Sequence, residues 1–320
     1  MKCLYCNKII ADNASDKEKV NGWHNKCVRQ FFGTSKFPII DISNKNLIEI
    51  ASESTNKGFT VPGVQKKLSL HFEDGAKPRL TLSNYPTGYI LKPQTEDYEA
   101  MPEAEFLVMS MAKITGIKTV PFALVKLDGG YAYITKRIDR EGGNMLAMED
   151  FCQLEERLTQ DKYKGSYERC AKLIDKYSER RGFDMSELFL RLVFSFVTGN
   201  SDMHLKNFSL IEDGAGSQKY MLSAAYDLLP VNAILPEDDE QFALTINGKK
   251  RNIRKKDFLL FAENAGIPTA AAQKIIADVV SLEDTYISMC KDSYLPEHLK
   301  TALIDIITSR TSVLRDQKTN

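Results

Sequence analysis

Three polar residues in the second half of the chain have the types and the spacing that phosphoryl transfer requires. Asp202 and Asn207 stand five positions apart in the segment GNSDMHLKN, and Asp227 follows twenty positions after the asparagine. Such a transfer needs one carboxylate to orient or deprotonate the attacking hydroxyl, and it needs oxygen ligands that hold Mg²⁺ against the phosphates. The pattern predicts that Asp202 is the catalytic base and that Asn207 and Asp227 bind magnesium.

The residues around these three favour the same chemistry. His204 and Lys206 lie inside the segment, where a cation could contact phosphate oxygens and stabilise charge in the transition state. Protein kinases use the same order of aspartate, asparagine five residues on, hairpin and second aspartate. The alternative interpretation is that Asp-x₄-Asn is a polar turn with no catalytic role. The elements on either side of the segment favour the catalytic interpretation.

A buried helix and a hairpin are expected to position the segment. Residues 186–198 are apolar nearly all round, which predicts a core helix ending at Gly199. Strand-like runs at 208–211 and 220–222, with a turn signal between them, predict a hairpin. Residues 255–316 predict a set of helices, so this half of the chain is expected to be mainly helical.

The first half of the chain is expected to be rich in strands with one helix. The helix is predicted over 102–114, with a proline near its start and Gly116 after its end. The runs at 122–127 and 131–135 flank an Asp-Gly-Gly turn and predict a hairpin. Further strands are predicted at 67–72 and 89–92.

Lys92 ends one of these strands, and Glu105 follows thirteen positions later on the predicted helix. Kinases hold the nucleotide phosphates with a strand lysine that pairs with a helix glutamate in this chain order. The alternative is an ordinary lysine at a strand end. The order favours a Lys92–Glu105 ion pair that serves a nucleotide.

Four metal-ligating residues stand as two close pairs at the amino terminus. Cys3 and Cys6 are separated by two residues, and so are His24 and Cys27. Zinc favours tetrahedral sulfur and nitrogen ligands, and paired spacing of this kind builds such sites. A unit of about 30 residues cannot build its own core, so a metal would supply the missing stability. The alternative is free thiols beside a fortuitous histidine. We predict a structural Zn²⁺ held by all four residues.

Composition narrows the function classes. The 320 residues carry 43 basic and 43 acidic side chains, so no general attraction to nucleic acid or anionic membrane is expected. The apolar stretches are too short for a membrane helix, and the amino terminus lacks the apolar region of a secretion signal. We therefore predict a cytoplasmic protein. The remaining cysteines are expected to be small buried hydrophobes; they are Cys152, Cys170 and Cys290.

Several segments together resemble the HipA family of serine/threonine kinases, which are toxins of bacterial toxin–antitoxin systems. In chain order they are GVQKKL (63–68), ILKP (90–93), KRIDR (136–140), MEDFCQ (148–153), GNSDMHLKNFS (199–209) and AYDLLP (225–230). The resemblance spans about residues 58–235 and implies an α+β, bilobal, protein-kinase-like fold that uses ATP and Mg²⁺. The expected division is a zinc-ribbon-like unit at 1–35, a strand-rich N-lobe at 36–140 and a helical C-lobe at 141–320.

The resemblance also assigns site residues. It implies a phosphate-covering loop at 62–67, a hinge at 136–138 that meets adenine, and Asp202 as the catalytic residue. The nucleotide-binding residues would be Gly63, Val64, Gln65, Lys66, Lys67, Lys92, Lys136, Arg137, Ile138, His204, Lys206, Asn207, Tyr226 and Asp227. Two departures stand out. The chain has no GxGxxG run, and Thr60 occupies the position of the serine that the family autophosphorylates.

The resemblance implies protein partners as well. The substrate would be a protein of translation such as an aminoacyl-tRNA synthetase, and a HipB-like helix-turn-helix antitoxin would bind the kinase. Larger family members carry an amino-terminal domain that the cysteine-rich unit replaces here. In this respect the chain resembles the shorter HipT-type kinases, for which a separate HipS-like small protein is a further expected partner.

Two other functions remain open from the residues alone. The segment Leu259 to Val280, with Gly266 at its bend, has helix-turn-helix character and, together with a zinc ribbon, would suit a nucleic-acid-binding regulator. The neutral charge opposes that interpretation, because such domains usually carry a basic surface. A kinase acting on a small molecule would need the same phosphoryl-transfer residues as a protein kinase.

Overall fold

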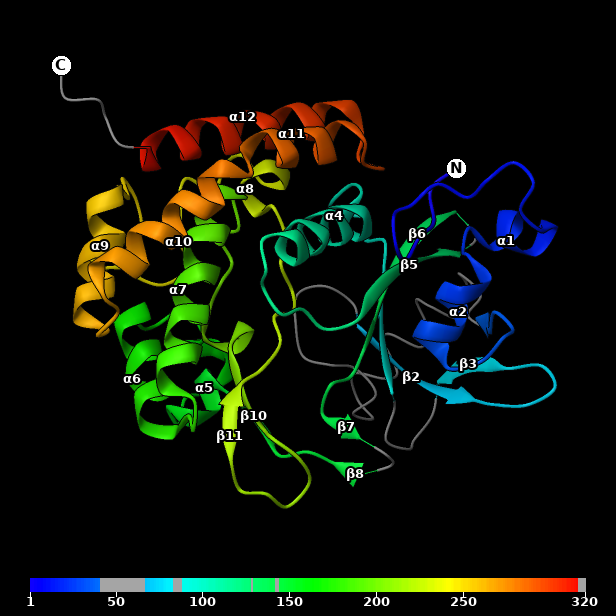
Figure 1. Ribbon diagram of the computed structural model, residues 1–320, viewed down its shortest axis with the longest axis horizontal. Helices are drawn as coiled ribbons and strands as arrows, with labels where there is room; N and C mark the ends of the chain where they lie inside the picture. Colours follow the sequence, from blue (N-terminus) through cyan, green and yellow to red (C-terminus); the bar gives the residue numbers. More distant parts are fainter. Residues whose placement is uncertain (41–66, 83–87, 128, 142–143, 316–320) are drawn as a thin grey trace. The chain divides into compact units, whose positions relative to one another are not determined.

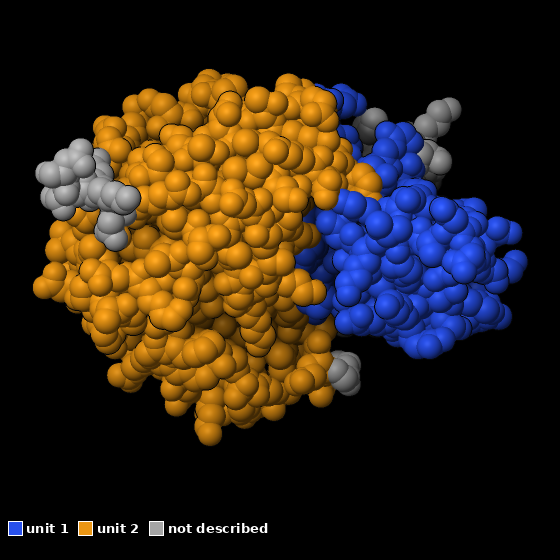
Figure 2. Space-filling view, turned by 45° about the horizontal axis from the view of Figure 1, so that its top comes forward, with its two compact units in different colours: residues 1–106, 120–137 blue, residues 107–119, 138–320 orange. Residues whose placement is uncertain are grey.

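The computed structural model describes residues 1–40, 67–82, 88–127, 129–141 and 144–315 (Figure 1). The chain forms two compact units, drawn in different colours in Figure 2. Unit 1 comprises residues 1–106 and 120–137, and unit 2 comprises residues 107–119 and 138–320. None of the helices in these described ranges is long and apolar enough to cross a membrane.

Unit 1 is built on a six-stranded sheet with the strand order β1-β3-β2-β4-β6-β5. All neighbouring strands are antiparallel except β1 and β3. Strand β5 occupies one edge, and its hairpin partner β6 lies between β5 and β4. The strands are β1 (Ile39–Ile40), β2 (Leu68–Glu73), β3 (Arg79–Leu82), β4 (Tyr89–Pro93), β5 (Phe122–Leu127) and β6 (Gly130–Lys136).

Two short helices precede the sheet, and a longer one follows β4. Helix α1 (Asp16–Asn21) begins at Ser15, which forms a capping box with Glu18 and so satisfies backbone donors of the first turn. Helix α2 (Asn25–Phe32) buries an apolar face that includes Phe31 and Phe32. Helix α4 (Met101–Ile114) begins in unit 1 and continues beyond Phe106 into unit 2.

Unit 2 is mainly helical, with a three-stranded sheet of order β11-β10-β9 and a small β7–β8 pair. Its strands are β7 (Arg140–Glu141), β8 (Asn144–Met145), β9 (Met148–Asp150), β10 (Ser209–Glu212) and β11 (Tyr220–Leu222). Its α-helices are α5 (Phe151–Leu154), α6 (Tyr167–Tyr177), α7 (Arg181–Val197), α8 (Val231–Ile234), α9 (Lys255–Asn264), α10 (Thr269–Ser281), α11 (Glu283–Lys291) and α12 (Glu297–Leu314). Two 3₁₀ turns lie at Thr159–Asp161 and Leu205–Asn207.

Helix α7 is the buried centre of unit 2, as its apolar sequence predicts, and α6, α10 and α12 pack on it. The helix begins earlier than predicted because Asp184 is buried with specific partners. Its carboxylate accepts hydrogen bonds from Ser178 Oγ at 2.6 Å and from the backbone nitrogen of Leu222 at 2.7 Å. Residues 181–183 of the first turn are exposed, and the Asp184 carboxylate alone enters the interior, where these donors satisfy it.

The far end of α7 is fixed by α12. The guanidinium of Arg310 donates to the carbonyl of Phe196 at 2.8 Å and to Asn232 Oδ1 at 2.6 Å. Gly199 follows with φ 72°, and a Cβ on it would stand 3.1 Å from Cγ2 of Ile306. This position therefore requires glycine for its backbone conformation and for its close approach to α12. These contacts therefore fix the backbone position at which the polar segment after Gly199 begins.

The elements predicted around the polar segments are confirmed. The β4 strand, the α4 helix, the β5–β6 hairpin and the β10–β11 hairpin all form where the sequence patterns indicate. The helix-turn-helix-like segment corresponds to α9 and α10, which meet at Gly266. Phe258 and Phe261 of α9 are fully buried and lie against Phe189 of α7. One face of this helix pair therefore belongs to the core of unit 2.

Candidate active site

The lysine and the glutamate predicted to pair in unit 1 do so. Lys92 Nζ lies 2.6 Å from Glu105 Oε1, and the two side chains are 5% and 0% exposed. The ammonium also lies 5.4 Å from the ring centroid of Tyr133, which stands opposite Lys92 in the β4–β6 pairing. Both charges are buried and paired, so β4 and α4 hold the lysine in one place.

The segment after α7 in unit 2 is a tight turn held by its own polar groups. The amide of Asn207 donates through Nδ2 to the carbonyl of Asp202 at 2.8 Å. The backbone nitrogen of His204 donates to the same carbonyl at 2.8 Å, and Asn207 N donates to His204 O at 2.9 Å. Because the amide nitrogen of Asn207 is bonded to the turn, its oxygen faces away from the Asp202 carbonyl. The backbone that carries Asp202 and the side chain of Asn207 are thus fixed together.

The Asp202 side chain is 45% exposed, and a tyrosine that sequence reasoning did not single out contacts it. Tyr163 donates through its hydroxyl to Asp202 Oδ1 at 2.8 Å, and its ring meets the edge of His204 at 5.2 Å between centroids. Burial, followed by the nearby Asp202 charge, raises the pKa of Tyr163. The phenol therefore remains a hydrogen-bond donor to this carboxylate at neutral pH.

Lys206 is held by a second residue that was not predicted as part of the site. Its ammonium lies 2.6 Å from Asp150 Oδ2, and Asp150 also caps α5 by accepting from Gln153 N at 2.9 Å. The backbone oxygen of Lys206 accepts from the hydroxyl of Tyr226 at 3.1 Å, and that hydroxyl lies 2.5 Å from Ser209 Oγ. The MEDFCQ segment therefore orients the lysine of the GNSDMHLKN segment.

Asp227 directly follows Tyr226 and has an unusual backbone. Its φ is 61°, in the left-handed region, which aspartate tolerates better than most residues. The residue is partly exposed, and two positions before it the backbone nitrogen of Ala225 donates to the Lys118 carbonyl at 2.7 Å. Non-glycine residues in this conformation are often found at functional sites.

The predicted hinge lies where the chain passes from unit 1 to unit 2, between Arg137 and Ile138. The Lys136 ammonium lies 5.6 Å from the ring centroid of Phe31 and 5.8 Å from that of Tyr89. Burial lowers the pKa of this lysine. Arg137 N donates to the Gly88 carbonyl at 2.9 Å, which ties the start of the hinge to β4.

The other predicted nucleotide residues belong to the segment before β2. Lys67 immediately precedes β2 and is partly exposed. Thr60, Gly63, Val64, Gln65 and Lys66 lie outside the described residues. Unit 2 thus brings Asp202, His204, Lys206, Asn207 and Tyr226 into one bonded group, whereas Lys92, Glu105 and Lys136 belong to unit 1.

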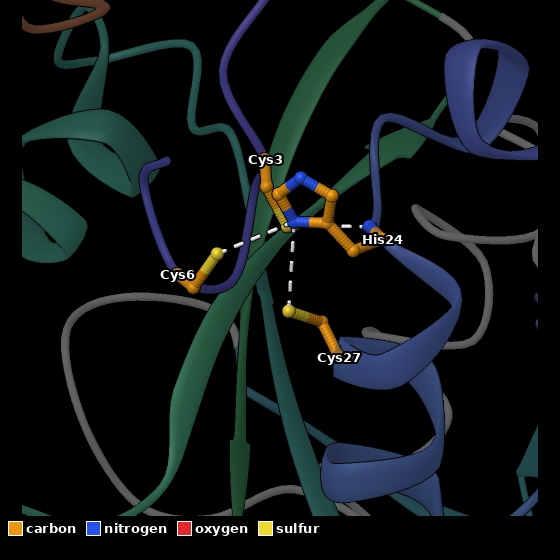
Figure 3. Close-up of side chains that lie close together, drawn as sticks. All are labelled: Cys3, Cys6, His24 and Cys27. Carbon is orange, nitrogen blue, oxygen red and sulfur yellow. Dashed lines mark hydrogen bonds between the residues drawn. The ribbon is translucent and has the colours of Figure 1, made fainter. Parts of the chain in front are cut away.

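The amino-terminal cysteines and histidine converge in unit 1 (Figure 3). The ligand atoms of Cys3, Cys6, His24 and Cys27 all lie within 4.8 Å of one another. His24 Nδ1 is 3.4 Å from Cys6 Sγ and 3.8 Å from Cys27 Sγ, and the backbone nitrogen of His24 is 3.5 Å from Cys3 Sγ. Three sulfurs and one nitrogen at these separations are compatible with a tetrahedral zinc site.

The surroundings of the cluster also suit a cation. His24 Nε2 lies 3.1 Å from the carbonyl of Ile9, which can only accept a hydrogen bond. The ring proton therefore belongs on Nε2, and the lone pair of Nδ1 is directed at the thiols. Burial raises the pKa of Cys3, and burial together with the neighbouring thiols raises that of Cys27. A bound dication would reverse this preference, because coordination deprotonates thiols.

Comparison with solved structures shows what fold this arrangement belongs to. The chain is similar to HipA of Shewanella oneidensis in its complex with HipB and operator DNA, with a TM-score of 0.67 and 19% identity over 87% of this chain and 74% of that one. It is also similar to the Helicobacter pylori proinflammatory kinase CtkA, with a TM-score of 0.55 and 15% identity over 79% and 90% of the two chains. The protein therefore has an α+β, HipA-like kinase fold.

The family follows from the sequence match. The model of the HipA-like C-terminal domain matches residues 59–285, which is more than half of the chain. The chain belongs to the HipA-like C-terminal domain family. The resemblance inferred from the sequence motifs is thereby confirmed.

Two curated relatives carry kinase names. The chain is 33% identical to “Putative kinase Y4dM” of Sinorhizobium fredii over 63% of this chain and 52% of that relative. It is 24% identical to a protein of Haemophilus influenzae with the same kinase description, over 91% of this chain and 92% of that one. The chain therefore spans about half the length of the first relative and nearly all of the second.

Proposed function

We propose that this protein is an ATP-dependent serine/threonine protein kinase of the HipA type. The turn at 202–207 is the observation that carries the proposal. There the side chain of Asn207 is bonded to the backbone of Asp202 at 2.8 Å, so a carboxylate and an amide oxygen are presented from one rigid turn. Phosphoryl transfer depends mainly on such positioning, because the transition state needs little covalent help from the protein.

Each residue of the site has a distinct role in this proposal. Asp202 orients the substrate hydroxyl and accepts its proton while the hydroxyl oxygen bonds to the γ-phosphorus and the bond to the β–γ bridging oxygen breaks. Lys92, held by Glu105, contacts the phosphates of ATP. The hinge at 136–138 meets adenine, and the loop at 62–67 covers the phosphates.

The remaining roles concern charge. His204 and Lys206 stabilise negative charge on the phosphates, and the contacts of Lys206 with Asp150 and of Tyr226 with the Lys206 carbonyl support this geometry. Asn207 and Asp227 supply oxygen ligands for Mg²⁺, which hard cations prefer. When bound, the magnesium neutralises charge between the β- and γ-phosphates.

The family suggests partners and a setting. We propose that the kinase phosphorylates itself and a protein of translation such as an aminoacyl-tRNA synthetase, and that it acts in the cytoplasm as the toxin of a toxin–antitoxin system. A HipB-like antitoxin is the proposed inhibitor, since the similar Shewanella structure contains HipB together with HipA. A separate HipS-like small protein is a further proposed partner.

The cysteine/histidine cluster is proposed to hold one structural Zn²⁺. Four protein ligands leave no open position for chemistry, so the metal would stabilise the fold and take no part in transfer. Elemental analysis of freshly purified protein should find about one zinc per chain. Protein without bound metal would contradict this assignment.

The kinase proposal is tested by two substitutions that should fail in different ways. Asp227→Asn should weaken binding of Mg-ATP, because this carboxylate would hold the metal already when the nucleotide binds. Asp202→Asn should leave Mg-ATP affinity nearly unchanged and reduce transfer by ~10²–10⁴, because the hydroxyl is oriented chiefly in the transition state. Calorimetric ATP binding and a phosphotransfer assay measure the two effects. Full transfer activity in Asp202→Asn would refute the proposal.

A further inference from the structure

The amino-terminal segment covers the open edge of the unit 1 sheet. Strand β5 is the last strand, so the outer side of its backbone needs other partners. Leu124 N donates to the Leu4 carbonyl at 2.9 Å, and the Leu124 carbonyl accepts from Trp23 Nε1 at 3.1 Å. Lys126 Nζ also reaches the Val20 carbonyl at 3.1 Å. These bonds occupy an edge that would otherwise be open to pairing with another chain.

The same segment covers part of one face of the sheet. The rings of Phe31 and Phe32 each lie 5.8 Å from Tyr89 of β4, and Phe32 lies 6.3 Å from Phe72 of β2. The hydroxyl of Tyr89 donates to the Phe31 carbonyl at 3.3 Å. Trp23 is fully buried among these rings. Helix α2 is therefore docked by aromatic packing and by a specific hydrogen bond.

The metal-ligating residues stand next to the residues that make these contacts. Cys3 precedes Leu4, His24 follows Trp23, and Cys27 lies one turn before Phe31 on α2. Helix α1, which connects the two pairs of ligands, buries none of its residues. The two contact-making stretches meet through a backbone hydrogen bond, from Leu4 N to the Gly22 carbonyl at 2.9 Å. A metal at the cluster would add a further direct link between them.

Phe31, one of these rings, contacts a residue that is predicted to bind the nucleotide. The ammonium of Lys136 lies 5.6 Å from the ring centroid of Phe31 and 5.8 Å from that of Tyr89. The aromatic rings attract the cation and fix where it stands. Lys136 begins the hinge, so the position of α2 bears on the segment proposed to meet adenine.

We propose that Zn²⁺ bound by Cys3, Cys6, His24 and Cys27 clamps the amino-terminal segment onto the edge of β5 and onto β4, and that ATP affinity depends on this clamp through Phe31 and Lys136. The second half of this inference rests on the proposed kinase function. The first half concerns only metal binding and docking, and it is tested independently of ATP.

The single tryptophan of the chain provides the readout for docking. Trp23 is 0% exposed, so its fluorescence should be blue-shifted and protected from acrylamide in the metal-bound protein. The full chain is stripped of metal with a strong chelator under reducing conditions, dialysed, and compared with the untreated and zinc-reloaded samples. We expect emission to shift to the red on stripping and to return on addition of Zn²⁺. Unchanged emission and quenching after verified metal removal would overturn the clamp.

Substitution of one cluster ligand, compared with substitution of a cysteine outside the cluster, shows whether the effects belong to the metal ligands. Cys6→Ser removes a partly exposed ligand and should release both the metal and Trp23. Cys152→Ser is the control, because its buried thiol lies within donating distance of the carbonyls of Arg157 and Leu158, and a serine hydroxyl can donate to either. This control should keep metal content and Trp23 emission. Retained metal and emission in Cys6→Ser would contradict the assigned ligands.

The coupling to nucleotide is measured by calorimetry with Mg-ATP after dialysis into magnesium buffer. Loss of zinc should raise the Kd for ATP about tenfold, which corresponds to about 1.4 kcal/mol. Phe31→Leu keeps all four ligands and tests the link without metal loss. It should retain zinc and raise the Kd about fivefold, as expected for loss of a partly buried cation–π contact.

Three outcomes distinguish the parts of the inference. If Trp23 responds to metal but neither zinc loss nor Phe31→Leu changes the Kd for ATP, the coupling is wrong. If the untreated protein binds no ATP, the proposed kinase function fails, and the fluorescence result still decides the clamp. If Cys6→Ser does not fold, the reversible stripping and reloading of the parent chain decides the first half.

Discussion

The hydroxyl of Tyr163 donates a 2.8 Å hydrogen bond to Oδ1 of Asp202, although the two residues are 39 positions apart. The loop that carries Tyr163 is itself tied to the turn, because Leu205 N donates to the Lys162 carbonyl at 3.2 Å. The backbone of the turn does not by itself fix the orientation of the Asp202 carboxylate, which is partly exposed. The hydrogen bond from the phenol holds this carboxylate in one orientation. Tyr163 is a positioning residue in the proposed mechanism.

Tyr163→Phe should lower kcat for phosphotransfer about tenfold and leave the affinity for Mg-ATP unchanged. The substitution removes one hydrogen bond to a charged group, worth about 1.5 kcal/mol, and keeps the ring against His204. Steady-state kinetics together with calorimetric ATP binding measure the two quantities. A parallel loss of ATP affinity would indicate a structural role, and an unchanged kcat would remove Tyr163 from the mechanism.

The Lys92–Glu105 pair is expected to affect both the stability of the fold and the affinity for Mg-ATP. Glu105→Gln removes the carboxylate that lies 2.6 Å from a buried ammonium and should cost about 3–5 kcal/mol of unfolding free energy. Adding Lys92→Met should recover part of that loss, because the double variant also removes the buried ammonium. Urea unfolding of the two single variants and the double variant measures this coupling. Additive losses would show that the pair is not energetically linked.

The same double variant separates stability from function. It should remain folded but bind Mg-ATP weakly, because the lysine that contacts phosphate is gone. Calorimetry at equal fractions of folded protein is the measurement. Nucleotide affinity equal to that of the parent chain would exclude Lys92 from the ATP site.

Arg310 gives a test of how α12 supports the active turn. Burial lowers the pKa of Arg310 to about 10, so the guanidinium is still charged at neutral pH when it donates to the Phe196 carbonyl and to Asn232. Arg310→Ala should cost about 2 kcal/mol of stability and reduce kcat, because buried acceptors lose a charged donor at the end of α7.

The control for this prediction is Arg251→Ala. Arg251 pairs with Asp239 on the surface, with side chains 55% and 64% exposed, and such pairs contribute little. Thermal unfolding and transfer kinetics of the two variants are compared. Equal effects at the two positions would contradict a specific role for Arg310.

Thr60 is the predicted site of autophosphorylation and lies outside the described residues. After incubation with Mg-ATP, phosphate should be found at this position, and Thr60→Ala should remove it. A phosphate adds roughly two negative charges near the proposed phosphate-covering loop, so the modified protein should be less active. Peptide mass spectrometry locates the label. Phosphate found only at other residues would reject Thr60 and leave the kinase proposal standing.

Local patterns predicted the elements and two of the residue clusters. The apolar run of α7 and the turn residues of the β10–β11 hairpin determine structure over short distances, so they can be read from the chain. The Lys92–Glu105 contact was predictable because strand and helix succeed one another in a known order. The convergence of the Cys/His pairs was predictable because their spacing suits one metal.

The supporting contacts were not predictable, because each depends on residues that meet only in the folded chain. Asp150 reaches Lys206 across 56 positions, and Arg310 reaches Phe196 across 114. Neither spacing forms a pattern. The start of α7 was misjudged for a related reason, since Asp184 breaks the apolar run but is buried by partners on β11 and in the preceding loop.

The backbone of Asp227 has a consequence for the relation between stability and activity. An L-residue held at a φ of 61° is less stable there than glycine in the same conformation, by about 1 kcal/mol. The folded chain without ligand therefore carries a local strain at the residue proposed to bind magnesium, and ligand binding at that carboxylate would offset it. Selection for thermal stability alone would tend to replace this aspartate by glycine and remove the proposed metal ligand. Under the proposed function, this position is one where the sequence favours metal binding over stability.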